Sequence, residues 1–219
     1  MIADLRGQTV LLAEVESPLR EAFEAAFLRH GARCLHAADD ALAETLKLLH
    51  CEGDGLDVLI GGSALRLPRV SGPEDYDAEA LTRVATDGVW PVFARLQRAR
   101  EIFGRYPKCV IALSASAPER FEDGMDLCAA AEAMLEALCR YANHWLSAEG
   151  ARMNILRHDL TKPRAAGPSA TPEEIANAAV ALCSGLLNSM GGQVLTVDRG
   201  ASFCDNPIRD YDRLPTRGK

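Results

Sequence analysis

Apolar residues in the first part of the chain alternate between short continuous runs and a helical spacing. The runs at residues 10–13 ("VLLA"), 32–38 ("ARCLHAA") and 56–62 ("LDVLIGG") are typical of buried strands. Between them, two sets of apolar residues each lie on one helical face: Leu19, Phe23, Ala26 and Phe27, then Leu42, Leu46 and Leu49. The pattern predicts strand, helix, strand, helix, strand.

The rest of the chain continues this alternation after a loop rich in proline, glycine and acidic residues at about 67–77. Strands are predicted at residues 108–116, 151–160 and 191–198. A long helical region carries Val89, Val92, Phe93, Leu96 and Phe103, an alanine-rich helix spans about 125–146, and Thr171, Pro172 and Glu174 open another helix as a capping box.

Strands that alternate with helices indicate an α/β fold, a doubly wound parallel sheet, because parallel strands need crossover connections that cover both faces of the sheet. The 219 residues suit one domain. We expect this domain at residues 1–204, followed by a C-terminal tail at 205–219 that carries two prolines and several charges.

Charge and hydropathy exclude two classes of partner. The formal net charge is -7, whereas binding to a phosphate backbone needs clustered lysine and arginine, so nucleic acid is not expected. No apolar run approaches the roughly 18 residues of a membrane span, so no membrane partner is expected. The first residues lack the features of a secretory signal, which favours a cytoplasmic location.

The seven cysteines are scattered without a CxxC pair and fall mostly in apolar contexts. This is typical of reduced, buried thiols, and no disulfide is expected. Cys34 and His36 lie two residues apart, but the chain lacks the two tight ligand pairs of a structural zinc site. We therefore expect no metal.

Two C-terminal segments have the pattern of a known family. "SAEGARMNIL" (residues 147–156) and "TPEEIANAAVALCSGLLNSMGGQVLTVDRG" (residues 171–200) resemble a strand and the C-terminal signature of the short-chain dehydrogenase/reductase family. The resemblance covers nearly the whole chain and implies a Rossmann-type sheet. The segment between Gly31 and Asp57 is shorter than its counterpart in the family, which implies the loss of one edge strand after the second strand.

The positions that hold the cofactor in the family are altered. Glu14, Pro18 and Arg20 stand where the family has the three glycines of its phosphate-binding turn. Those glycines allow a tight turn and close approach of backbone amides to a pyrophosphate. We therefore expect this chain to bind no cofactor, with NAD bound only by a catalytic partner. Asp39 lies near the ribose-binding acid of the family and is interpreted as a helix cap.

The positions that carry chemistry in the family are altered as well. Met125 and Ala129 replace its catalytic tyrosine and lysine, and neither side chain can transfer a proton. No catalytic residue is therefore assigned. The segments that the family uses for folding and assembly are matched, which favours a retained structural role.

The resemblance implies a non-catalytic subunit, a pseudoenzyme, that assembles with a homologous catalytic subunit, as a hetero-oligomer and most simply a heterotetramer. In the family two long helices form the subunit interface. The corresponding residues are Val89, Val92, Phe93, Leu96, Ala130, Ala133 and Ala137. The pattern of lost motifs further suggests an NAD-dependent complex that oxidises a hydroxyacyl-CoA thioester of the hydroxybenzylsuccinyl-CoA type.

Two alternatives come from other classes of function. The chain could be an atypical active oxidoreductase with a rebuilt site near Ser114 and His158. It could also be a ligand-sensing binding module, although no ligand motif indicates a candidate.

Overall fold

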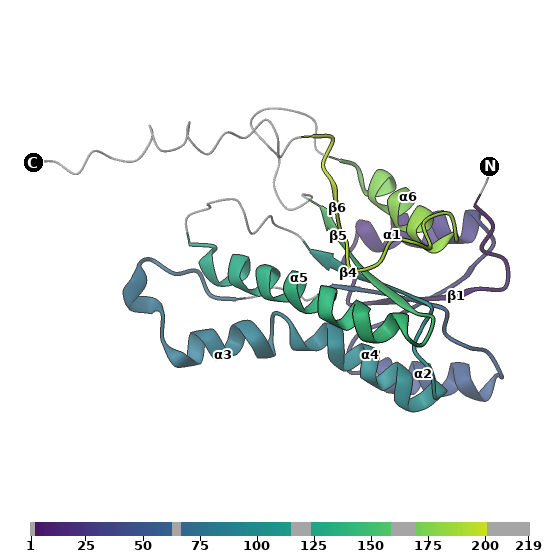
Figure 1. Ribbon diagram of the computed structural model, residues 1–219, viewed down its shortest axis with the longest axis horizontal. Coiled ribbons are helices and arrows are strands. Elements are labelled where there is room, and N and C mark those ends of the chain that lie inside the picture. The colour runs from purple at the N-terminus through teal and green to yellow at the C-terminus, as the bar shows by residue number, and fades with distance from the viewer. Residues whose placement is uncertain (1–2, 63–66, 115–123, 159–169, 201–219) are drawn as a thin grey trace, which may run out of the picture.

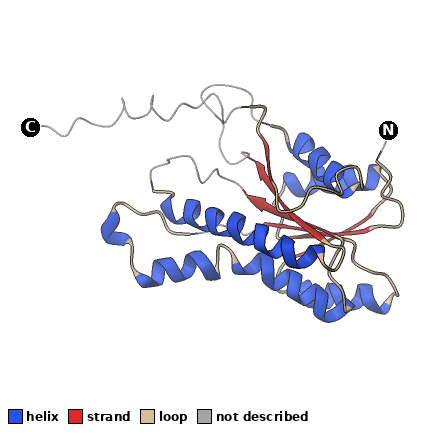
Figure 2. Ribbon diagram, in the orientation of Figure 1, coloured by secondary structure: helices blue, strands red, loops and turns tan. Residues whose placement is uncertain are grey.

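The computed structural model describes residues 3–62, 67–114, 124–158 and 170–200 of the chain. Six parallel strands form one sheet between two layers of helices (Figure 1; Figure 2). The strands are β1 (Thr9–Ala13), β2 (Arg33–Ala37), β3 (Val58–Gly62), β4 (Cys109–Ser114), β5 (Arg152–His158) and β6 (Val194–Val197). Their order is β2-β1-β3-β4-β5-β6.

The strand order confirms the predicted doubly wound parallel sheet. From β1 the chain first builds outward through β2, then returns to the other side for β3 to β6. The order therefore reverses between β1 and β3, and a reversal of this kind is where α/β proteins bind ligands. Within the described ranges β2 is the outermost strand on its side, as expected from the short segment before Asp57.

The helices divide between the two faces of the sheet. Their bounds are α1 (Leu19–Arg29), α2 (Leu42–Cys51), α3 (Ala78–Thr86), α4 (Trp90–Phe103), α5 (Asp126–Ser147) and α6 (Pro172–Cys183), with a short 3-10 turn at Pro73–Asp75. Helices α1 and α6 pack together on one face, and α2, α4 and α5 cover the other (Figure 1). Two apolar cores result, one on each side of the sheet.

The local patterns fold as predicted in most elements. The buried residues of α1 are the four that its apolar spacing indicates, and Thr171 and Glu174 form the expected capping box of α6. The long helical region before β4 is instead two helices, α3 and α4. The break falls at Gly88 and Val89, and Pro91 occupies the first turn of α4, where its missing N–H is not needed.

In the part of the chain that the structure describes, no helix combines the length and the apolar character that crossing a membrane would require. The expected tail at 205–219 lies outside the described residues.

Candidate functional site

The candidate site lies at the carboxyl ends of the strands, where β1, β2 and β3 bring together residues that are far apart in the sequence. Glu14 follows β1, Asp39 follows β2, and Gly61 and Gly62 end β3. Arg95 reaches the same edge from α4. Ligands of α/β proteins bind outside this edge of the sheet, so these residues form the first half of the site.

Arg95 holds this half of the site together. Its Nε donates to Asp39 Oδ1 at 2.6 Å and its Nη2 to Asp39 Oδ2 at 2.8 Å, so the pairing is bidentate. A third bond runs from Nη1 to the carbonyl oxygen of Gly62. The Arg95 side chain is only 3% exposed, whereas the Asp39 side chain is 48% exposed. The carboxylate of Asp39 is therefore fixed in orientation and still accessible.

Gly61 makes room for the guanidinium of Arg95. A Cβ atom at this position would lie 3.1 Å from Arg95 Nη1 and 3.1 Å from the carbonyl oxygen of Ala13. Both contacts are tighter than ordinary van der Waals packing, and one partner is backbone that cannot move freely. The side chain of residue 61 must be absent for Arg95 to approach the strand.

Asp39 is not a helix cap, contrary to the interpretation from the sequence. The N-cap of α2 is Ala41, which provides no side-chain hydrogen bond. The carboxylate of Asp39 instead pairs with Arg95, and its backbone N–H donates to Glu14 Oε1 at 2.9 Å. The side chain is thus available at the end of β2.

The turn after β1 has a glycine-like backbone at Glu14, the first of the three positions where the family has glycine. Glu14 has φ +50, in the left-handed region that glycine adopts without steric cost. Two hydrogen bonds hold it there: its N–H donates to the carbonyl oxygen of Ala37 at 3.2 Å, and its carboxylate accepts from Asp39. The tight turn therefore forms without the glycine.

The other two altered positions lie at the start of α1. Pro18 is its N-cap and Arg20 its second residue, half-buried, with its backbone N–H bonded to the carbonyl oxygen of Glu16 at 2.9 Å. Arg20 places a cation at a helix N-terminus, where the helix dipole also favours an anion.

The second half of the carboxyl edge contains buried polar side chains from β4, β5 and α5. Ser114 ends β4 and is in register with Arg157 of β5. Arg157 donates to Glu136 Oε1 of α5, through Nε at 3.2 Å and through Nη2. Glu132, one helical turn before Glu136, is also buried. Arg157 and Glu136 therefore form a buried ion pair between β5 and α5.

The structure does not bring Ser114 and His158 together as a nucleophile and its base. Ser114 is in register with Arg157, and register partners in a parallel sheet point to the same face. His158 is the next residue, so its side chain points to the opposite face. The two residues named for a rebuilt active site therefore lie on different sides of the sheet.

Met125 and Ala129, the expected replacements for the catalytic pair, lie at the N-terminal end of α5. Met125 is its N-cap, and the backbone N–H of Ala129 donates to the carbonyl oxygen of Met125 at 2.9 Å. Both are half-buried. A thioether and a methyl group cannot act as acid or base, so neither residue can perform proton transfer.

The residues expected at a subunit interface divide into two groups. Val89, Val92 and Leu96 are buried in the core of the single chain, and Phe93 packs against that core. These side chains are therefore not part of an exposed face, since α4 packs them against the sheet and its neighbouring helices. The alanines are exposed: Ala130, Ala133 and Ala137 lie on the outer side of α5.

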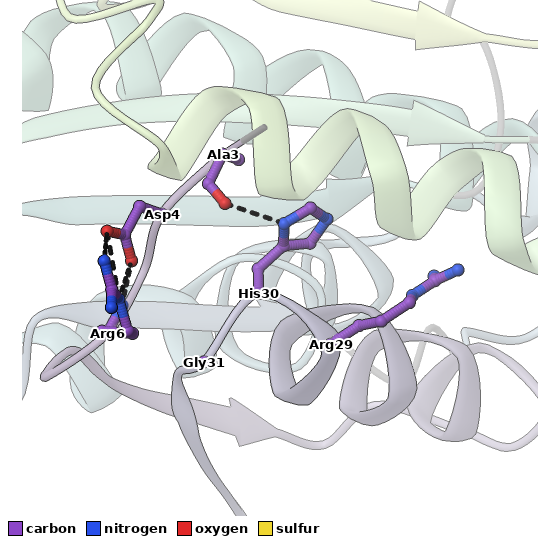
Figure 3. A pocket seen from close by; sticks show the side chains of 6 residues that line it. All are labelled: Ala3, Asp4, Arg6, Arg29, His30 and Gly31. Atoms are coloured by element: carbon purple, nitrogen blue, oxygen red, sulfur yellow. Dashed lines mark hydrogen bonds and ion pairs between the residues drawn. The ribbon is translucent and has the colours of Figure 1, made fainter. Parts of the chain in front are cut away.

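A surface depression of about 400 Å³ lies at the other end of the molecule, lined by Ala3, Asp4, Arg6, Arg29, His30 and Gly31 (Figure 3). There His30 Nδ1 contacts the carbonyl oxygen of Ala3 at 2.9 Å, and Arg6 pairs with Asp4. This depression is beside the amino ends of the strands. Within the ranges that the structure describes, no three His, Cys, Asp or Glu side chains gather as metal ligands.

Sequence reasoning missed Arg95, which organises the first half of the site. The signal was present but weak: Arg95 falls within the apolar helical stripe of Val92, Leu96 and Ala99. A charge buried at such a position needs a partner of opposite charge. That partner, Asp39, is 56 residues away in the sequence, and only the fold brings the two together.

The sequence matches no protein-family profile and no curated protein, but the fold matches solved structures. The enoyl-[acyl-carrier-protein] reductase (NADH) from Aquifex aeolicus VF5 has a TM-score of 0.73 and 19% identity, with 90% of this chain and 97% of that chain covered. The Bacillus cereus enoyl-acyl carrier protein reductase with NADP+ and indole naphthyridinone has a TM-score of 0.74 and 15% identity, covering 93% and 100%.

A third similar structure is the enoyl-(acyl-carrier-protein) reductase from Anaplasma phagocytophilum in complex with NAD. Its TM-score is 0.73 at 14% identity, over 91% of this chain and 95% of that chain. Such reductases belong to the short-chain dehydrogenase/reductase superfamily. This chain shares the Rossmann-type α/β fold of these reductases. At these identities the likeness establishes the fold, and substrates do not transfer with it.

The expectation that this chain binds no cofactor is wrong. The solved structures that share its fold over at least 90% of its length are a reductase named for NADH and reductases with bound NADP+ or NAD, and this finding contradicts the expectation. The physical reason lies in the turn after β1. The expectation assumed that the turn is lost with its glycines, yet Glu14 adopts the backbone conformation that the first glycine would supply.

Proposed function

We propose that the chain binds a nicotinamide dinucleotide at the carboxyl edge of its sheet and works as a subunit of a short-chain dehydrogenase/reductase-type oxidoreductase. The observation that carries this proposal is the carboxylate of Asp39. It lies just past the end of β2, oriented by Arg95 and half-exposed. In Rossmann-type folds an acid near this point hydrogen-bonds the ribose of NAD.

The residues present fit the adenosine half of such a cofactor. A carboxylate accepts hydrogen bonds from ribose hydroxyls, and Asp39 is held in one orientation before any ligand binds. A 2′-phosphate would instead meet this negative charge. The chain should therefore prefer NAD(H) to NADP(H).

The phosphate half would be held differently from the glycine-rich pattern. Arg20 supplies a cation in the first turn of α1, beside the helix N-terminus, and both favour an anion. One oxygen of the Glu14 carboxylate is occupied by the backbone N–H of Asp39, which reduces its repulsion of a phosphate. When bound, the dinucleotide would supply hydride transfer; the residues of this chain bind and orient it.

The proton transfer that accompanies hydride transfer comes from a second, catalytic chain in this proposal. Met125 and Ala129 lack any group that can hold or release a proton, and Ser114 and His158 lie on opposite faces of the sheet. We therefore retain the hypothesis of a non-catalytic subunit in a hetero-oligomer. The corresponding reaction is the oxidation of a hydroxyacyl-CoA thioester, as in 2-[hydroxy(phenyl)methyl]succinyl-CoA dehydrogenase, whose inactive subunit has a similar pattern of lost motifs.

The outer side of α5 supports the proposed assembly. Small side chains at Ala130, Ala133 and Ala137 allow another helix to approach closely. Large apolar side chains lie exposed on the same helix: Met134, Leu138, Tyr141 and Trp145, of which Tyr141 and Trp145 are each 72% exposed. Contiguous exposed apolar surface of this kind marks an interaction site.

Titration of the purified chain with NADH and NADPH tests the nucleotide site. NADH should bind more tightly than NADPH, and Asp39→Asn should weaken NADH binding by about tenfold or more, because a hydrogen bond to a charged group contributes about 1.5–3 kcal/mol. The matched control is Asp40→Asn, an exposed neighbour outside the network, which should bind like the wild type. Thermal melts of both variants separate loss of binding from loss of folding.

Two results would contradict the proposal. An isolated wild-type chain that binds neither nucleotide at millimolar concentration has no dinucleotide site. Turnover of NADH with a thioester substrate by the isolated chain would instead show that it carries its own acid–base residue and is not the non-catalytic partner.

A further inference from the structure

A pair of buried thiols lies at the amino edge of the sheet, opposite the proposed nucleotide site. Cys109 is the first residue of β4 and Cys183 the last residue of α6. Their Sγ atoms are 3.6 Å apart, and Cys183 donates to Cys109. The two cysteines are 74 positions apart in the sequence, so only the packing of α6 on the sheet brings them together.

A cation accompanies the two thiols. Arg152, the first residue of β5, is in register with Cys109, so its side chain points to the same face of the sheet. Its Nη2 donates to the carbonyl oxygen of Leu182 at 2.7 Å, and the thiol of Cys109 donates a weaker hydrogen bond to this same oxygen at 3.9 Å. The Nε of Arg152 is buried and has no hydrogen-bond acceptor in the described part of the chain.

Two of these contacts favour a thiolate at Cys109. The hydrogen bond from Cys183 and, as a smaller contribution, the charge of Arg152 lower the pKa of Cys109 against the opposing effect of burial, whereas burial raises the pKa of Cys183. One thiol of the pair is therefore prepared as the nucleophile and the other remains protonated. The nearby carboxylate of Asp57 is paired separately, with Lys108 at 3.1 Å and Arg105 at 3.7 Å.

We propose that Cys109 and Cys183 are a redox-active dithiol that closes to an intramolecular disulfide when a peroxide oxidises the chain. The thiolate of Cys109 attacks one peroxide oxygen and becomes a sulfenic acid, and the peroxide O–O bond breaks to release water or an alcohol after proton uptake. Cys183 then attacks this sulfur, a disulfide forms, and the sulfenic oxygen leaves as water. Two thiols lose two electrons and two protons, and the peroxide is reduced.

The two sulfurs are already in contact, and closure requires them to approach from 3.6 Å to about 2.05 Å. Cys183 is the last residue of α6, and helix ends fray by local unfolding. A small peroxide can reach the pair of thiols while this end is unfolded. The product would link α6 to β4 covalently and restrict the unfolded chain.

Oxidation of the full chain with hydrogen peroxide tests the proposal. Remaining thiols are alkylated in denaturant, and the protein is digested without reduction and analysed by mass spectrometry. A peptide linking Cys109 to Cys183 should appear and disappear on reduction. Cys139 is the internal control: it is an equally buried single thiol on α5, and burial raises its pKa to about 12. It should remain a thiol during oxidation and then be alkylated.

Arg152 acts in this proposal as a positioning residue, and a pH profile tests that role. Replacing Arg152 by methionine keeps its approximate length and removes its charge. Disulfide closure should then slow at neutral pH by roughly tenfold for each pKa unit that Cys109 rises, with recovery at higher pH, while Arg152→Lys should retain most of the rate. A purely structural role would slow closure equally at every pH.

The proposal is overturned if Cys109 and Cys183 are both still thiols, and so are alkylated, in a sample in which the exposed Cys51 has been fully oxidised. It is also overturned if the linked peptide appears only after the chain has been oxidised in denaturant and not after oxidation of the folded chain. Both oxidation measurements use the wild-type chain, so they do not depend on the folding of a variant.

Discussion

At the scale of single residues, the carboxyl edge depends on an arginine buried against backbone. Arg95 is accommodated because Gly61 has no side chain, and it is stabilised because it pairs with Asp39 and with the carbonyl of Gly62. An uncompensated guanidinium in this environment would be strongly destabilising. The orientation of Asp39, and hence the proposed ribose contact, therefore follows from a missing Cβ atom on the neighbouring strand.

The two consecutive glycines of β3 allow a matched test of this packing. Gly61→Ala should destabilise the fold by about 1–3 kcal/mol, because its Cβ would crowd Arg95 and the Ala13 carbonyl at 3.1 Å. Gly62→Ala should change stability by less than about 1 kcal/mol, since its nearest contacts are at 3.6 Å and 3.7 Å. Urea unfolding of both variants gives the comparison; equal effects would show that Gly61 has no special packing role.

At the scale of an element, α6 shows how a local signature positions a whole helix. Thr171 Oγ1 accepts from the backbone N–H of Glu174 at 3.2 Å, and Glu174 accepts in return from the N–H of Thr171 at 2.8 Å. Arg199, just past β6, donates to the same glutamate at 2.7 Å and lowers its pKa. The cap thus ties the start of α6 to the end of the last strand.

Removing this cap should have a measurable cost. Thr171→Ala should lower the free energy of unfolding by about 1 kcal/mol, because one N-terminal N–H of α6 loses its acceptor. For a protein of this size that corresponds to about 2–4 °C in melting temperature. The control is Thr82→Ala within α3, where the hydroxyl bonds only to the carbonyl oxygen of Ala78 one turn earlier. Equal losses in the two variants would contradict a capping role for Thr171.

At the scale of the whole molecule, the helix layers on the two faces of the sheet differ in how much apolar surface they leave exposed. Helices α1 and α6 pack against each other over one face (Figure 1). On the other face, α5 buries its inner side against the sheet and leaves a long apolar outer side exposed. Helix α5 therefore carries the exposed apolar surface that the proposed assembly would use.

A charge placed on that surface should prevent assembly without unfolding the chain. Ala137→Glu should abolish or greatly weaken the hetero-oligomer seen by native mass spectrometry of protein recovered from its own cells, because a buried unpaired charge is costly. Ala25→Glu, at an exposed position of α1, should assemble like the wild type. The co-purifying chain should retain a glycine-rich turn and a Tyr/Lys pair. Recovery of a homo-oligomer only, or of intact complex from Ala137→Glu, would contradict the proposed assembly.

The amino-acid sequence by itself determined most of the elements and their order. Strands and helices differ in the period of their apolar residues, and this period is local, as in the four buried residues of α1 or the capping box of α6. The strict alternation of strands and helices then fixed a parallel, doubly wound sheet, because crossovers have one handedness. The resemblance of the C-terminal motifs correctly indicated the same fold.

Only the tertiary structure decided which residues meet. Asp39 and Arg95 are 56 positions apart and Cys109 and Cys183 are 74 apart, so no local pattern connects them. The spacing of Val89, Val92 and Leu96 showed that one side of α4 is buried. Only the structure shows that these residues are buried in the core of the same chain rather than by a partner. The left-handed backbone of Glu14 is likewise stabilised by β2 and the turn after it, since Glu14 donates its N–H to Ala37 and its carboxylate accepts from Asp39.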